Sequence, residues 1–304
     1  MEENIKRGAK LGRLAKTLIK LIVTLVALYW VSTKVDFVEV KSALLQSNFF
    51  YLFLALLAYL ASQIVASSRL LGYFHGVGLH LQEGYNFKLY LLGLFYNMFL
   101  PGGIGGDGYK FYLLRKKHQI SGKQLFSAIF FDRVSGLWAL SLFTAALIMM
   151  LPQLGIPNWI PVTVVVIETL VYYLVIRQFF NAFAGVFVSS HIKAIISWSF
   201  QIVSVICLLY ALDFEGKFSP YLFSFLLSSL VAIIPLSAGG LGLREMANVY
   251  GANYFHLDTH LAVLISLLFY IIALIVALSG AYFIFKPKHL GEAKLPLLEE
   301  LPED

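Results

Sequence analysis

The chain has 304 residues, of which 59% are hydrophobic, 15% aromatic and 13% charged. Soluble domains average about 45–50% apolar and about 25% charged residues, so this composition excludes an ordinary soluble protein and indicates an integral membrane protein. The formal net charge is +6, and the basic residues gather in Lys6–Lys20 and Lys110–Lys123. Such clusters are typical of cytoplasmic segments beside anionic lipid, so we expect no nucleic-acid partner.

The N-terminal segment is basic and then apolar. Its apolar run, Leu21–Thr33, is short, so a spanning helix requires Lys16, Lys20 and Lys34 to snorkel towards the interfaces. No small-residue cleavage site follows, which favours a retained anchor over a signal peptide. The basic residues place the N-terminus in the cytoplasm, and the loop near Lys34–Lys41 is expected to be charge-balanced.

Further along the chain, apolar runs are long enough to cross a hydrocarbon layer of about 30 Å. The predicted helices are Phe49–Leu71, Gln124–Met150, Pro161–Ile176, Ala194–Leu212 and Leu261–Phe285. The prolines and glycine of "LPQLGIPNWIP" separate the second from the third. The single cysteine, Cys207, excludes an intramolecular disulfide.

One apolar run is broken by "LPGGIGGDGYKFYLLRKKH", residues 100–118. If residues 89–106 spanned the membrane, the following basic residues would lie outside, against the positive-inside rule. A re-entrant hairpin over residues 87–116, which enters and leaves on the cytoplasmic side, removes this conflict. Its turn is predicted at Pro101, Gly102, Gly103, Gly105 and Gly106.

A second break, "IIPLSAGGLGLRE" at residues 233–245, contains Gly239, Gly240 and Gly242. It predicts a hairpin over residues 218–254 that enters from the outer face. Gly102 and Gly239 are 137 residues apart, and the same offset relates the flanking predicted helices. The alternative is that the two glycine clusters are unrelated packing motifs.

These patterns predict an all-α polytopic membrane protein with about six transmembrane helices and two glycine-broken re-entrant hairpins in two inverted repeats. The first repeat covers residues 1–150 and the second residues 151–285, followed by a cytoplasmic acidic tail at 286–304. Each half has three crossings, and an odd number inverts the second half. Inverted repeats with broken helices are typical of transporters, whose substrate site lies between the repeats.

Six ionisable residues are predicted at membrane depth, where each costs about 2.5–3.5 kcal/mol and therefore needs a partner or a polar cavity. They are Asp107, Asp132, Arg133, Glu168, Arg244 and Glu245, with Arg69 nearer an interface. All of these except Glu168 and Arg69 are the five predicted substrate-site residues. Asp132 and Arg133 are adjacent on a helix and point in different directions, so each needs its own partner.

Asp107 and Arg244 each follow a glycine break, at the start of a returning helix. Asp107 is a helix cap, a cavity carboxylate, or both. Arg244 beside free helix amides needs an anion, which Glu245, Asp132 or a bound phosphate would supply.

Other polar residues carry weaker signals. Lys110, Arg115, Lys116 and Lys117 are predicted to form a solvated cytoplasmic loop. The pair of His256 and His260 lacks a third ligand, so we expect no metal site. No nucleophile elbow or nucleotide-binding loop is present, so we predict no catalytic residue and no cofactor.

Three stretches, "LPGGIGGDGYKFYLL", "FDRVSGLWAL" and "SAGGLGLRE", resemble the signatures of a flippase-like membrane family. That family includes the transmembrane region of lysylphosphatidylglycerol synthases, and the resemblance covers about residues 10–285. It implies movement of a polar-headed lipid between leaflets. In the two-domain synthases a soluble domain aminoacylates the lipid, and we expect this chain to lack that domain.

The sequence thus favours a lipid translocator in the cell (inner, plasma) membrane, with both termini in the cytoplasm. Its partners are expected to be anionic or phosphate-bearing membrane lipids, with a lipid-modifying enzyme left open. The alternative is a membrane-embedded enzyme, or an accessory subunit of a glycosyl- or aminoacyl-lipid transferase.

Overall fold

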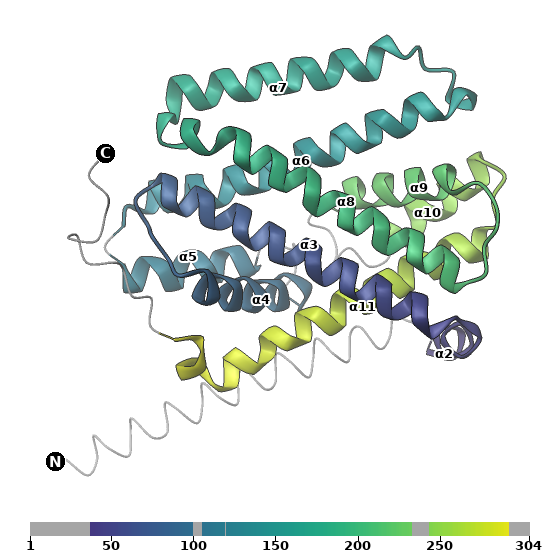
Figure 1. Ribbon diagram of the computed structural model, residues 1–304, viewed down its shortest axis with the longest axis horizontal. Helices are drawn as coiled ribbons and strands as arrows, with labels where there is room; N and C mark the ends of the chain where they lie inside the picture. The colour runs from purple at the N-terminus through teal and green to yellow at the C-terminus, as the bar shows by residue number, and fades with distance from the viewer. Residues whose placement is uncertain (1–36, 100–104, 119, 233–242, 292–304) are drawn as a thin grey trace.

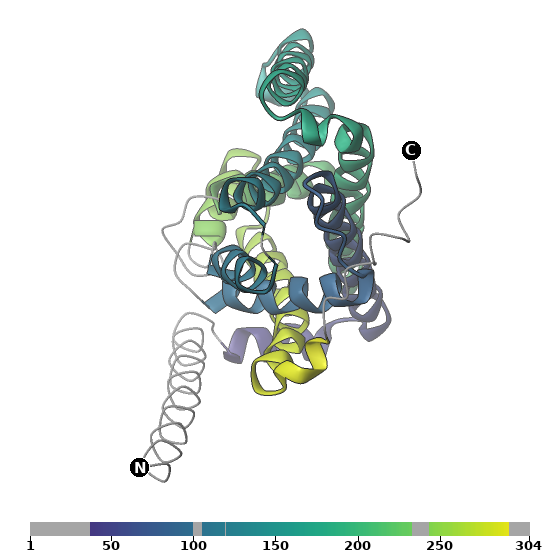
Figure 2. The same cartoon turned by 90° about the vertical axis from the view of Figure 1, so that its left-hand side faces the viewer.

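The computed structural model describes residues 37–99, 105–118, 120–232 and 243–291. Within these ranges the regular elements are all helices, with no β-strand. Figures 1 and 2 show long helices lying side by side, with shorter helices packed among them. The predicted all-α class is therefore confirmed for the part of the chain that the structure describes.

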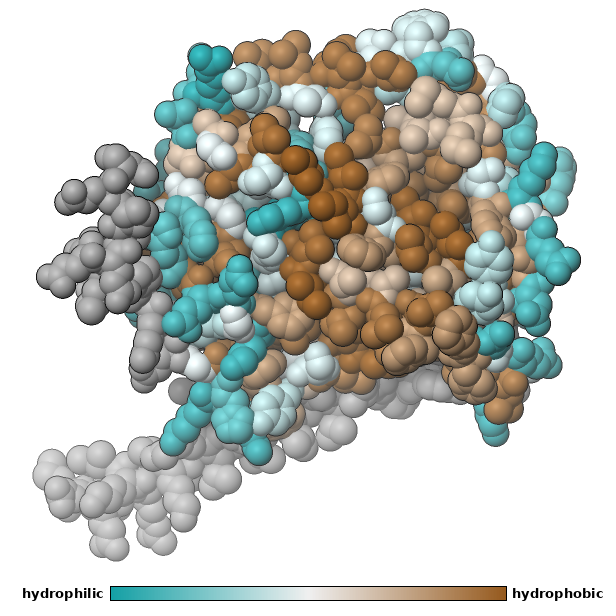
Figure 3. All heavy atoms as spheres, viewed as in Figure 1, coloured by the Kyte–Doolittle hydropathy of each residue, from teal (hydrophilic) through white to brown (hydrophobic). Residues whose placement is uncertain are grey.

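Within the described residues, five helices are long and apolar enough to cross a membrane. They are α3 (Phe49–Gly76), α6 (Gly122–Met150), α7 (Trp159–Phe179), α8 (Phe187–Ala211, counted with the preceding η2, Asn181–Val186) and α11 (Thr259–Phe285). Figure 3 shows apolar residues over the middle of one face and hydrophilic residues towards the two ends of the long helices. The protein is thus an integral membrane protein. The first predicted helix, around Leu21–Thr33, lies outside the described residues.

The predicted spans recur with longer bounds. The helix expected to end near Leu71 continues to Gly76, and the one expected to begin at Ala194 begins at Phe187. The starts of α3 and α11 are capped by side chains just before them in the chain. The Asn48 side chain accepts a hydrogen bond from the Phe50 amide (3.0 Å) at the start of α3, and Asp258 accepts from the His260 amide (2.8 Å) at the start of α11.

Two pairs of shorter helices occupy the predicted hairpin regions. α4 (Glu83–Phe99) packs on α5 (Gly105–Lys117), and α9 (Phe218–Val231) packs on α10 (Leu243–Tyr254). The intervening segments, 100–104 and 233–242, lie outside the described residues. They contain the predicted turn residues Pro101, Gly102, Gly103, Gly239, Gly240 and Gly242.

Two predictions about local structure need correction. Gly105 and Gly106 were expected in the turn, but they form the first turn of α5. There the Gly106 amide donates to Asn97 Oδ1 of α4 (2.7 Å), so a side chain on the neighbouring helix replaces the missing hydrogen-bond partner of this helix start. The stretch expected to be a loop up to Lys41 includes helix α2 (Phe37–Gln46), which contacts α11.

Glycines allow the short helices to approach their neighbours closely. A Cβ on Gly106 would lie 1.9 Å from the Gly93 carbonyl oxygen of α4. A Cβ on Gly280 of α11 would lie 2.1 Å from the Leu91 carbonyl oxygen, again on α4. In lipid no hydrophobic force drives helices together, so they associate through close backbone contact at small residues. The glycines thus set the position of α4 between α5 and α11.

Helices α3 and α8 pack against each other and are joined by serine hydrogen bonds. Ser197 Oγ of α8 donates to the Ser62 carbonyl of α3 (3.0 Å), and Ser204 Oγ donates to the Ala55 carbonyl (2.9 Å). Helix α7 instead lies at the outer edge in both ribbon views. Most of its side chains are exposed, which fits contact with lipid hydrocarbon. Three 3₁₀ turns, η1 (Pro152–Leu154), η2 (Asn181–Val186) and η4 (Pro287–Leu290), complete the described elements.

Candidate functional site

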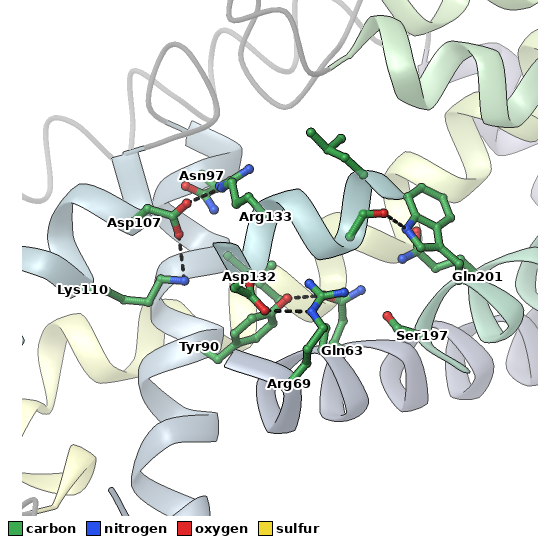
Figure 4. Close-up of a pocket in the computed structure, with 15 residues that line it drawn as sticks. Gln63, Arg69, Tyr90, Asn97, Asp107, Lys110, Asp132, Arg133, Ser197 and Gln201 are labelled. Carbon is green, nitrogen blue, oxygen red and sulfur yellow. Dashed lines mark hydrogen bonds and ion pairs between the residues drawn. The ribbon is translucent and has the colours of Figure 1, made fainter. Parts of the chain in front are cut away.

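A polar cavity of about 250 Å³ lies among α3, α4, α5, α6 and α8 (Figure 4). Each helix contributes residues at helical spacing, so one face of every helix points into the same space. The charged lining residues are Arg69, Asp107, Lys110, Asp132 and Arg133. The neutral polar lining residues are Gln63, Tyr90, Asn97, Ser197 and Gln201.

One charged pair in the cavity joins α3 to α6. Arg69 Nε donates to Asp132 Oδ1 at 2.8 Å, and each residue is only 7% exposed. Two buried ions are costly to remove from water, and direct contact with a hydrogen bond offsets much of that cost. This pair therefore places a cation and its carboxylate partner together at the cavity wall.

The second charged group is centred on Asp107 in the first turn of α5. Its Oδ1 accepts from Lys110 Nζ at 2.8 Å, one helical turn further on, and its Oδ2 accepts from Arg133 Nε of α6. Lys110 is 4% exposed, whereas the Arg133 side chain is 45% exposed. One carboxylate thus uses both oxygens to hold two cations, one buried and one reaching the outside.

Two glycines make room for these cations. A Cβ on Gly136 would lie 3.3 Å from a terminal nitrogen of the Arg69 guanidinium. A Cβ on Gly93 would lie 2.8 Å from Lys110 Cε. The absent side chains leave the space in which each cation lies against the facing helix backbone.

The cavity carries an excess of positive charge. Three cationic and two carboxylate side chains line it, which leaves one formal positive charge beyond the internal pairs. His118, in the turn that follows α5, adds no positive charge at neutral pH, because burial and the nearby Lys117 lower the pKa of its imidazole. The site is thus suited to a group with one negative charge and several hydrogen-bond acceptors.

Comparison with known families supports the membrane assignment. The sequence model described as the lysylphosphatidylglycerol synthase TM region matches residues 17–280 of the chain. The chain belongs to this family. No curated protein matches the chain. The cavity residues of this member of the lysylphosphatidylglycerol synthase TM region family all lie inside the matched range.

The structure brings together three of the five predicted site residues. Asp107, Asp132 and Arg133 line the cavity, and Asp132 and Arg133 have separate partners. Asp107, which the sequence left open as a helix cap, a cavity carboxylate or both, lines the cavity. The described cap of α5 comes from Asn97 instead.

Two charged residues of the cavity, Arg69 and Lys110, were not predicted as site residues from the sequence. Arg69 was placed near an interface, but it is the partner of Asp132. Lys110 was assigned to a solvated loop, but it is buried. Its position three residues after Asp107 on a helix was the available signal. For Arg69, the signal was that it is the only charged residue in the apolar segment Phe49–Leu71.

Arg244 and Glu245 lie elsewhere, on α10. The Arg244 guanidinium lies over the Phe269 ring, 5.9 Å from its centre. Its Nε is buried and has no hydrogen-bond partner among the described residues. Glu245 Oε1 accepts from Ser266 Oγ at 3.1 Å. Asp132, one predicted partner of Arg244, is paired with Arg69 instead. Among the described residues no group of three or more His, Cys, Asp or Glu side chains is arranged to hold a metal ion.

Proposed function

We propose that this protein moves a phosphate-bearing, polar-headed lipid between the leaflets of the membrane. The observation that carries the proposal is a polar, net positive cavity inside a bundle of membrane-spanning helices. A charged head group pays a large penalty in hydrocarbon, and that penalty is the barrier to spontaneous exchange. A cavity that supplies cations and hydrogen-bond donors at membrane depth lowers it.

The inverted-repeat architecture supports transport. Adding the offset of 137 residues to the bounds of α6 gives 259–287, and α11 spans Thr259–Phe285. The same shift takes α3 to 186–213, close to α8 (Phe187–Ala211), and α5 to 242–254, close to α10 (Leu243–Tyr254).

Helix packing follows the same correspondence. α4 packs on α11 as α9 packs on α6, α3 packs on α6 as α8 packs on α11, and α5 packs on α6 as α10 packs on α11. In Figure 1, α4 and α5 lie towards one end of the long helices, and α9 and α10 towards the other. At about 1.5 Å per residue, α5 and α10 are only about 20 Å long, too short to cross the membrane. These features favour two re-entrant hairpins that enter from opposite faces.

The charged pairs provide a means of binding and release. A phosphate that enters the cavity competes with Asp107 and Asp132 for Arg69, Lys110 and Arg133. Each cation can exchange one oxygen partner for another, so no charge is left buried alone as the lipid moves. In the second half, the 137-residue shift takes Asp107 to Arg244 and Arg133 to Tyr270. We propose that Arg244 receives the phosphate there, with Glu245 as its neighbour.

Orientation completes the proposal. The basic residues at the N-terminus and after α5 favour the cytoplasmic side, with both termini there, in the cell membrane.

A leaflet-exchange assay tests the function. The purified protein is reconstituted in vesicles with a fluorescent phosphatidylglycerol, and a membrane-impermeant quencher reports the outer-leaflet fraction over time. Loss of one charge-assisted hydrogen bond, about 1.5–3 kcal/mol, predicts that Arg69→Gln and Asp132→Asn slow exchange by about tenfold or more. Arg177→Gln, at an exposed position on α7, is the matched control and keeps the rate. Wild-type rates in both cavity variants would remove this cavity from the function.

A second candidate follows from the family name, which refers to a lipid synthase. In this reading the protein is a membrane-embedded enzyme, or an accessory subunit that presents lipid to a glycosyl- or aminoacyl-lipid transferase. Copurification of such a transferase, together with no leaflet exchange by the isolated protein, would favour it.

A further inference from the structure

A second hollow, of about 350 Å³, lies beside the polar cavity on the face formed by α5 and α6. Its wall is almost entirely apolar. Gly108 and Phe111 come from α5, and Phe126, Ile129 and Phe130 come from α6. We call this hollow the lateral groove.

The lateral groove and the polar cavity share one boundary. Asp107 and Arg133 line both, and their ion pair separates the two spaces. Figure 4 shows this pair on one side of the cavity, away from Arg69 and Asp132. The Arg133 side chain is 45% exposed and Asp107 only 14%. The cation is therefore the more accessible member of the pair, and the carboxylate is also held by Lys110.

The groove faces outward among exposed aromatic residues. Phe126 is 61% exposed and Phe130 is 49% exposed. Both belong to the first part of α6, a candidate membrane span. On a membrane span, exposed apolar side chains face the bilayer, so the molecules that meet this face have hydrocarbon chains.

We propose that the lateral groove binds the alkyl chain of the transported lipid and that the Asp107–Arg133 pair is the gate to the polar cavity. The inference rests on the proposed function for the identity of the head group only. In an isoprenoid phosphate the phosphate is attached to the apolar chain, and in a phospholipid only the esterified glycerol lies between them. A chain in the groove therefore puts its phosphate at Arg133, at the boundary of the two spaces.

The gate opens when the phosphate replaces Asp107 as the partner of Arg133. Asp107 keeps Lys110, whose Nζ lies 2.8 Å from Oδ1, so the carboxylate is not left unpaired. The head group then passes into the cavity while the chain stays in the groove. This arrangement selects amphiphiles with an anionic group beside the chain, and it disfavours free phosphate, which gains nothing from the apolar wall.

Gly108 offers a direct way to fill the groove. A Cβ at this position meets no atom within 4 Å, so Gly108→Leu extends into the groove without a backbone clash. Gly72→Leu is the matched control, because Gly72 of α3 also has open space around a Cβ and does not line the groove.

The assay uses phosphatidylglycerol with a photoreactive diazirine in one acyl chain, in vesicles that contain the full-length protein. After irradiation, mass spectrometry locates the cross-linked residues. We expect enrichment at Phe111, Phe126 and Phe130, and a loss of about fivefold or more in Gly108→Leu but not in Gly72→Leu. Phe126→Ser should also lose the cross-link, while Phe49→Ser, at a similarly exposed phenylalanine on α3, should keep it.

The outcomes separate this inference from the proposed function. Cross-links spread evenly over α6 and the exposed face of α7, or unchanged by Gly108→Leu in folded protein, would overturn the groove while leaving leaflet exchange untouched. A groove cross-link in a protein that does not exchange lipid would confirm the chain site and refute transport. Free glycerol phosphate that competes as well as the lipid would overturn selection by the chain.

Discussion

Two glycines on the same helix should respond in opposite ways to the same substitution. Gly106 and Gly108 both lie in the first half of α5. A Cβ on Gly106 would meet two backbone atoms of Gly93, at 1.9 Å and 2.6 Å, and the Asn97 side-chain oxygen at 2.8 Å. A Cβ on Gly108 would meet nothing within 4 Å. Comparing Gly106→Ala with Gly108→Ala therefore separates the effect of close helix packing on stability from the effect of helix propensity.

The magnitudes follow from the contacts. Ala is favoured over Gly inside a helix by about 1 kcal/mol, and this gain applies to both variants. For Gly106→Ala, α5 must move about 1.5 Å to restore an ordinary contact distance. Such overpacking costs about 1–3 kcal/mol, and loss of the bond from the Gly106 amide to Asn97 costs about 1 kcal/mol more. We expect Gly106→Ala to lose about 1–3 kcal/mol and Gly108→Ala to gain about 1 kcal/mol.

The measurement is the unfolding midpoint of the purified protein in detergent, followed by tryptophan fluorescence. Trp198 lines the cavity and Trp138 lies nearby on α6, so the signal reports on this region. Gly72→Ala on α3, where a Cβ also meets nothing within 4 Å, should behave like Gly108→Ala. If Gly106→Ala proves as stable as Gly108→Ala, the close approach of α5 to α4 is not what holds this helix.

Three further predictions concern the charged residues. Asp132→Asn leaves Arg69 as a buried cation without its carboxylate, so it should lower the free energy of unfolding by about 3–5 kcal/mol. The double variant Arg69→Met/Asp132→Leu removes both charges and should lose less stability in the same unfolding measurement. Lys110→Met, at a buried ion pair, should reduce the binding of anionic lipid in a vesicle titration. Lys116→Met, at an exposed position, should leave that binding unchanged. Equal losses of binding in the two variants would refute a distinct role for Lys110. Lys116→Cys should react with an impermeant maleimide only after the cells are opened, and labelling of intact cells would overturn the predicted orientation.

Much of the architecture was predictable because membrane burial imposes simple rules on sequence. A span needs about 20 apolar residues, so α3, α6, α7, α8 and α11 could be located from composition alone. The two proline–glycine breaks indicated where the apolar runs stop, and the offset of 137 residues matched the helix starts closely. Loop charge was the only signal for orientation, and orientation stays a prediction.

The site was only partly predictable, because pairing in space is not written in local patterns. Adjacent Asp132 and Arg133 had to find separate partners, and sequence reasoning established that need. That the partners are Arg69, 63 residues before Asp132, and Asp107, 26 residues before Arg133, depended on how α3 and α5 pack against α6. Lys110 looked like one more basic residue of a cytoplasmic loop until α5 was seen to continue past it.

The sequence by itself determined that the chain is a helical membrane protein with two broken segments and costly charges at depth. Those conclusions rest on one-dimensional quantities: run length, composition and charge spacing. Only the tertiary structure decided which charges meet, because a contact between distant helices depends on their rotation and separation. Here Gly93, Gly106 and Gly280 set that separation by letting backbones touch. Together with the packing of α3 and α5 on α6, this separation places Arg69, Asp107, Lys110, Asp132 and Arg133 in one cavity.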